Sequence, residues 1–216
     1  MSIRAKYESD LEKLKIKLVQ MAKSVNLQIE NSVNSLINKD IELARQVANS
    51  DDIIDNFERD IESTCLKILL TQQPVASDFR EVSSILKMIT DLERIGDQAE
   101  DIANIVIDLM NTNYERKLVH IPAMTKIAID MVSNSIKSYV NADLELAKVV
   151  IKRDDEVDDL YMTVKSELVE EIRADVCDAE VALSLLIVAK YLERIGDHSV
   201  NICEWVEYYK TGEHKK

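Results

Sequence analysis

The sequence contains few of the residues that interrupt helices. Its 216 residues include only 3 glycines and 2 prolines, so little of the chain can form turns. No stretch rich in Val, Thr and aromatic residues, as β-strands favour, lies between turn signals. Ala, Leu, Lys, Glu and Ile, which favour helix, are abundant. The composition therefore predicts an all-α protein, long enough for one domain or two.

Other absences narrow the possible functions. The 3 cysteines form no CxxC pair, which predicts reduced thiols and a cytoplasmic location. The N-terminal residues contain no apolar segment of the kind that a signal peptide needs. The longest nearly apolar run, residues 182–189, is too short to cross a bilayer, so we expect no direct membrane insertion. The net charge of -13 argues against nucleic-acid binding, which needs clustered Lys and Arg.

Three long helices are predicted in the first half. Apolar residues recur at steps of three and four within 7–36, 43–68 and 85–109, the pattern of a helix that packs in a bundle. A polar break at 38–40 separates the first two helices. Pro74 ends the second, because proline disfavours helix in the residue before it. Asp78 with Glu81 three positions later resembles a capping box at the start of the third.

The second half repeats the first. Segment 111–121 breaks the helical period and ends at Pro122; beyond it, NKDIELAR at 38–45 returns as NADLELAK at 141–148. LERIGD at 92–97 returns at 192–197, and Asp178 is the expected N-cap of the last helix. Such matches indicate an internal duplication. We expect two tandem three-helix bundles, residues 1–112 and 120–212, with six long helices and the bundles placed end to end.

Both copies carry a glycine and rows of acids at unusual places. Gly96 and Gly196 lie deep within predicted helices, where glycine costs about 1 kcal/mol relative to alanine. Close helix packing or the approach of a bound ion's ligands would explain them. Acidic pairs four positions apart point from one helix face. They are Glu93 with Asp97, extended by Asp101, then Asp51 with Asp55, Asp154 with Asp158, and Glu193 with Asp197, extended by Asn201.

Hairpin geometry favours cation binding over a merely solvated surface as the role of these acidic rows. A single pair of like charges is mildly destabilising and is most simply a solvated face. If the second and third helices of each bundle are antiparallel, the turn near Pro74 puts Ile53 level with Gly96. The turn within 173–178 likewise puts Glu156 level with Gly196. Four carboxylates then share one height in each bundle, which favours hard, oxygen-preferring cations.

Other ligands and catalytic motifs are missing. No histidine follows a glutamate at the spacing of ferritin-like sites, and His198, whose counterpart is Gln98, is interpreted as a surface residue. Arg94 and Arg194 are expected to form salt bridges within their helices. No nucleophile elbow or phosphate-binding loop occurs. We expect a protein that is not an enzyme; a metal-dependent phosphoester hydrolase and a purely structural helical adaptor are the alternatives.

The duplicated LERIGD motif, with QPVASDFR at 73–80 before its first copy, resembles the PhoU family over essentially the whole chain. The resemblance implies two three-helix bundles that hold metal ions, Fe, Zn, Mn or Mg, on the acidic pairs. It also implies a negative regulator of phosphate uptake and of the phosphate-starvation response. The implied partners are the ATPase of a phosphate ABC transporter, a sensor histidine kinase and a second copy in a homodimer. The aromatic residues Trp205, Tyr208 and Tyr209 are candidates for an exposed docking surface.

Overall fold

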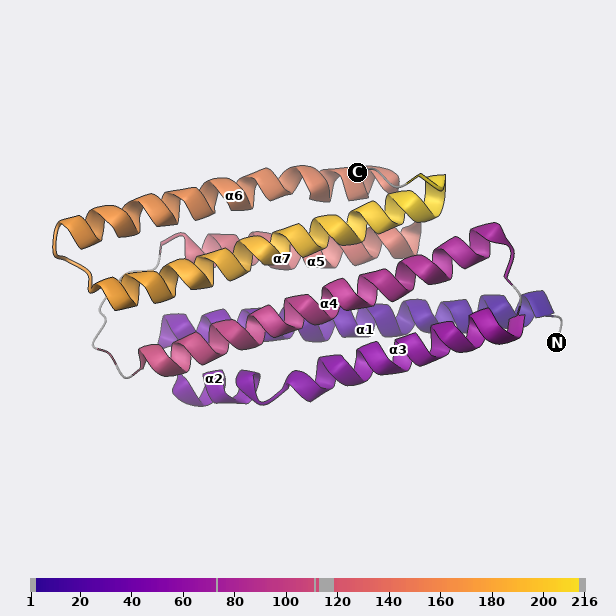
Figure 1. Ribbon diagram of the computed structural model, residues 1–216, viewed down its shortest axis with the longest axis horizontal. Coiled ribbons are helices and arrows are strands. Elements are labelled where there is room, and N and C mark those ends of the chain that lie inside the picture. The colour runs from indigo at the N-terminus through magenta and orange to yellow at the C-terminus, as the bar shows by residue number, and fades with distance from the viewer. Residues whose placement is uncertain (1–2, 73, 111, 113–118, 214–216) are drawn as a thin grey trace.

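The computed structural model describes residues 3–72, 74–110, 112 and 119–213, without the side chains of Ile3 and Asp51. Within these ranges the chain forms seven helices and no strand (Figure 1), so the predicted all-α fold is confirmed. The helices are α1 (Ile3–Asn38), α2 (Ile41–Ala48), α3 (Asp51–Gln72), α4 (Ala76–Leu109), α5 (Ile121–Asn141), α6 (Leu144–Arg173) and α7 (Ala179–Thr211). The first bundle contains α1 to α4, and the second contains α5 to α7.

The second predicted helix of the first bundle is interrupted, which the apolar pattern did not show. α2 ends at Ala48 and α3 begins at Asp51, whereas the equivalent α6 is continuous. Asn49 is the C-cap of α2, and Ser50 after it satisfies a carbonyl at the helix end, because its backbone N–H and its hydroxyl both donate to Val47 O, at 3.0 and 2.7 Å. The buried Gln28 of α1 donates to Ser50 O at 3.2 Å and to Ser50 Oγ at 3.1 Å. Gln28 therefore ties the interruption to α1 at Ser50.

Only one of the two predicted helix caps is present. Asp178 caps α7 as expected, since its Oδ1 accepts from the backbone N–H groups of Glu180 and Val181 at 2.8 and 3.3 Å. The capping box at Asp78 is wrong. α4 begins two residues earlier, at Ala76, which places Asp78 in its first turn, and that carboxylate pairs with Arg4 Nη1 at 2.6 Å. Asp78 still lies where the helix dipole favours negative charge.

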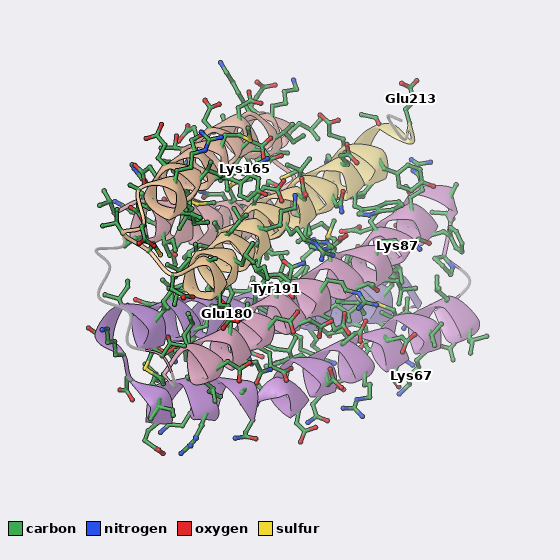
Figure 2. The ribbon with its side chains drawn as sticks, turned by 60° about the vertical axis from the view of Figure 1, so that its left-hand side comes forward. Lys67, Lys87, Lys165, Glu180, Tyr191 and Glu213 are labelled. Carbon is green, nitrogen blue, oxygen red and sulfur yellow. The ribbon has the colours of Figure 1, made fainter. Side chains whose placement is uncertain are left out.

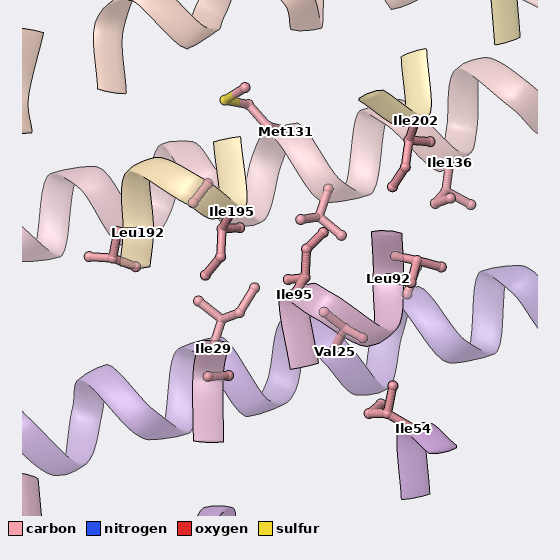
Figure 3. Close-up of a cluster of buried hydrophobic side chains, with 14 of the residues drawn as sticks. Val25, Ile29, Ile54, Leu92, Ile95, Met131, Ile136, Leu192, Ile195 and Ile202 are labelled. Carbon is pink, nitrogen blue, oxygen red and sulfur yellow. The ribbon is translucent and has the colours of Figure 1, made fainter. Parts of the chain in front are cut away.

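The two bundles lie side by side, and the expectation of an end-to-end arrangement is wrong. α4 packs along α7, and α1 packs along α5, both pairs antiparallel (Figure 1). Since α1 and α4 each pack antiparallel on their own counterpart from the other copy, an approximate two-fold axis relates the bundles. Ile95 and Ile195 face each other at this contact, with Val25 and Ile29 of α1 beneath them and Met131 of α5 above (Figure 3). All five are buried, so the bundles share one core.

No helix within the described ranges combines the length and the hydropathy that a bilayer-spanning segment needs. The limits of the two domains near residues 112 and 120 stay a prediction, because the residues between them lie largely outside the described part.

Candidate metal centre

The α6–α7 hairpin brings the acidic rows of the second bundle together. Burial and then, in decreasing order, the charges of Asp197, Asp158 and Glu193 together raise the pKa of Asp154 to about 6. Burial and the Glu193 charge also raise the pKa of Asp158. These mutual interactions show that the four predicted acids lie near one height of the hairpin. The antiparallel register derived from the turn therefore places them as expected.

Asp154 lies directly over Gly196. Its Oδ1 atom is buried and has no hydrogen-bond partner within the described part of the chain. A Cβ atom added at Gly196 would stand only 2.6 Å from that oxygen. An alanine at this position would therefore displace the carboxylate. In the second bundle the glycine makes room for an acidic side chain.

Gly96 has a different neighbour. A Cβ atom there would stand 3.3 Å from Ile54 Cγ2 and 3.5 Å from Gln28 Oε1. The glycine of the first copy thus permits close packing of α3 on α4. The side chain of Asp51, the counterpart of Asp154, lies outside the described residues.

The acids of the first bundle are also grouped. Burial, then the charge of Asp97, raises the pKa of Glu93, and burial likewise raises the pKa of Asp97. The Asp55 charge acts on both groups, so α3 and α4 bring their rows together. Glu58, three positions after Asp55, also raises the pKa of Glu93. Sequence reasoning missed Glu58, although its spacing from Asp55 placed it on the same helix face.

Basic side chains neutralise the two rows unequally. Arg94 pairs with Glu93 at 3.5 Å and with Asp97 at 3.2 Å, as expected, and Arg59 pairs with Asp55 at 3.3 Å. In the second bundle Lys190 pairs with Glu193 at 2.5 Å. Arg194 forms no such ion pair among the described residues, so its expected salt bridge is absent there. Lys190 was missed, although it stands three positions before Glu193, a spacing that favours pairing.

The last members of each row face the other bundle. Asn201 Nδ2 donates to Asp91 Oδ1 at 3.1 Å, and His198 Nδ1 lies 2.9 Å from the same oxygen. Tyr191, the counterpart of Asp91, lies between α7 and α4 (Figure 2). Burial raises its pKa, and a hydrogen bond and the charge of Asp101 raise it further. His198 is only 17% exposed, so its interpretation as a surface residue is wrong.

The donor set fits a hard cation. It consists of carboxylates, one of them holds a buried unpartnered oxygen, and a glycine leaves space beside that oxygen. As the side chains stand, no three His, Cys, Asp or Glu groups within the described ranges converge closely enough to hold a metal ion. Binding would therefore require side-chain rotation about χ1 and χ2, which carboxylates at the exposed edge of a hairpin can undergo.

Fold and site together define a class of duplicated three-helix bundle proteins with carboxylate rows on each hairpin. The PhoU domain matches residues 18–106 and 121–206, one match in each bundle. The chain belongs to the PhoU family.

Several relatives match nearly the whole chain. A protein of Clostridium acetobutylicum named phosphate-specific transport system accessory protein PhoU homolog is 37% identical, over 95% of this chain and 94% of its own. A protein of the same name from Aquifex aeolicus is 38% identical, over 94% and 92%. The crystal structure of PhoU from Pseudomonas aeruginosa superposes with a TM-score of 0.90 at 36% identity and covers 96% of this chain and 100% of its own. The side-by-side arrangement is therefore common to this chain and that crystal structure.

Proposed function

We propose that this protein is an accessory regulator of phosphate transport that restrains phosphate uptake and the phosphate-starvation response. The observation that carries the proposal is the match of both bundles to relatives named as phosphate-specific transport accessory proteins, over more than nine-tenths of each chain. Its partners are the ATPase of a phosphate ABC transporter and a sensor histidine kinase, and it acts as a homodimer. Its location in the cytoplasm stays a prediction from the sequence.

We further propose that metal ions occupy the two hairpins. In the second bundle Asp154, Asp158, Glu193 and Asp197 would hold them, and in the first Asp51, Asp55, Glu93 and Asp97. Supporting this, Asp154 Oδ1 is buried without a partner, and burial and neighbouring carboxylates raise its pKa. A cation would neutralise these like charges, so the metal-loaded bundles would be more stable than the metal-free ones.

The regulatory role is tested in a strain from which the gene has been deleted. We expect deletion to raise the activity of a phosphate-starvation reporter in phosphate-rich medium, and the intact gene to restore repression. Tagged protein from phosphate-replete cells should retain the transporter ATPase and the histidine kinase. Unchanged reporter activity in the deletion strain would contradict the regulatory proposal.

The metal sites are tested by elemental analysis of the purified protein. One variant changes Glu93, Asp97, Glu193 and Asp197 to Gln or Asn, and we expect it to lose the bound Fe, Zn, Mn or Mg. The matched control changes the exposed Glu42 and Glu145, at equivalent positions of α2 and α6, to Gln. Equal metal content in the two variants would contradict the site assignment and leave the regulatory role standing.

No observation favours the hydrolase or the purely structural adaptor, and we propose neither. The suggested aromatic docking surface also lacks support, because its residues are only partly exposed. Tyr209 packs edge-on against the buried Tyr139, with ring centroids 5.8 Å apart, and Trp205 packs in the same way against Tyr208. The homodimer is checked by sedimentation of the full chain.

A further inference from the structure

A cavity of about 220 Å³ lies between α1 and α5, away from the acidic rows. Its walls are largely apolar and include Val19 of α1 and Ile136 of α5. Four polar side chains also line it, namely Lys23 and Asn26 of α1 and Ser133 and Lys137 of α5. An apolar cleft with a few convergent polar groups is the usual form of a small-molecule site.

Asn26 links the two helices beside this cavity. Asn26 Nδ2 donates to Ser133 Oγ at 2.8 Å, which fixes the amide and leaves Asn26 Oδ1 as an acceptor. That oxygen is buried, and no donor within the described part of the chain reaches it. Because this oxygen has almost no accessible surface, a ligand in the cavity cannot reach it, and the Asn26–Ser133 hydrogen bond serves to tie α1 to α5 beside the cavity.

The charge of the cavity is opposite to that of the protein. The chain carries 40 acidic against 27 Lys and Arg residues, yet among the described residues the only ionisable groups lining this cavity are Lys23 and Lys137. Both are exposed, and neither ammonium forms an ion pair with any residue that the structure describes. Two ammonium groups that lack an acidic partner, beside an apolar cleft, are complementary to an anion that carries an apolar body.

The two-fold-related cavity provides a comparison inside the same molecule. It has a volume of about 310 Å³ and lies at the other end of the α1–α5 contact. There Lys126 occupies the position equivalent to Lys23, but Asn34 replaces Lys137 and Glu30 replaces Ser133. Asp130 adds a second acid. Since the two cavities descend from one duplicated unit, the paired lysines distinguish the first from its copy.

We propose that the cavity between Lys23 and Lys137 binds a small organic anion with a short apolar body, such as an alkyl carboxylate or an alkyl phosphate. The two ammonium groups receive the anionic head, and the apolar walls of α1 and α5 enclose the chain. This site is separate from the carboxylate rows and does not depend on their metal.

The proposal is tested by calorimetric titration of the full chain with monomeric octanoate and octyl phosphate. We expect saturable binding of one molecule of at least one of these probes. The double variant Lys23→Gln and Lys137→Gln should bind at least about tenfold more weakly, because it loses two charge-assisted contacts. Ser133→Phe, at an exposed position, should abolish binding by filling the cavity while leaving both lysines in place.

Matched controls separate the proposal from simpler explanations. Lys126→Gln removes the equivalent lysine of the other cavity and should leave the affinity unchanged. Acetate and inorganic phosphate present the head without the apolar body and should bind at least about tenfold more weakly than the alkyl probes. Equal binding of inorganic phosphate, equal loss in Lys126→Gln, or no saturable binding of either probe would overturn the proposal. So would cosedimentation with anionic vesicles that depends on Lys23 and Lys137, since it would assign the lysines to a membrane surface.

Discussion

His198 Nδ1 lies 2.9 Å from Asp91 Oδ1 and joins the second bundle to the first. Both side chains are largely buried, with exposures of 17% and 14%, so water replaces this contact poorly. His198→Ala should therefore lower the free energy of unfolding by about 1–3 kcal/mol, measured by chemical denaturation. His198→Gln introduces the residue found at the equivalent position 98. It should lower the free energy of unfolding less than His198→Ala does, because its amide can still donate to Asp91.

A double-mutant cycle with Asp91→Asn isolates the pair. The effects of His198→Ala and Asp91→Asn should fall short of additivity by at least about 0.5 kcal/mol, since each removes the same contact. Strict additivity would mean that the pair does not couple the two bundles.

Gly196→Ala should remove metal without unfolding the protein. The new Cβ atom would displace Asp154 Oδ1, which stands 2.6 Å away, while alanine improves helix propensity by about 1 kcal/mol. The second bundle should then lose its metal, whereas the unfolding free energies of the metal-free variant and the metal-free wild type should differ by no more than about 1 kcal/mol. Gly96→Ala is the control, because it meets Ile54 rather than a carboxylate. An unchanged metal content in Gly196→Ala would show that Asp154 is not a metal ligand.

Helical periodicity and the duplication predicted much of this molecule. Both are local signals: a stripe of apolar residues specifies a helix face, and a short turn specifies the register of the hairpin that follows. The placement of Asp154 beside Asp197 and Glu193 followed from that register alone. Asp178 as an N-cap was equally local, since it needs only a polar side chain before the first helical turn.

The contact between the bundles could not be derived in the same way. A single apolar stripe was assigned to each third helix, whereas Ile95, Gly96, Gln98 and Ala99 of α4 are all buried, so the buried surface extends beyond one stripe. Such breadth indicates a helix covered on two sides, which a side-by-side arrangement provides. His198 was misread for the same reason, because its partner lies 107 positions away in the chain.

Gln28 should stabilise α2 through its contacts at the interruption. Gln28→Met introduces the residue found at the equivalent position 131 and removes both hydrogen bonds that Gln28 Nε2 donates to Ser50. Amides of residues 41–50 should then exchange faster, as hydrogen–deuterium exchange would show, with a local loss of about 1–2 kcal/mol. The exposed Gln46→Met is the control. Equal exchange in wild type and Gln28→Met would mean that α2 is held by its apolar contacts alone.

The metal-free protein should become less stable as the pH rises from about 4 to 6. Asp154 has a pKa of about 6 in the folded chain, against about 3.9 for an unfolded aspartate. In that window the folded state binds more protons, so the unfolding free energy falls with rising pH and the loss is complete above about pH 6. After chelation, denaturation at several pH values should show a shallower fall for Asp154→Asn than for wild type. That variant should also be the more stable one at pH 7, because it removes a buried charge. The exposed Asp52→Asn in the first bundle should keep the wild-type slope, and an equal slope in all three proteins would show that Asp154 titrates alike in the folded and unfolded chain.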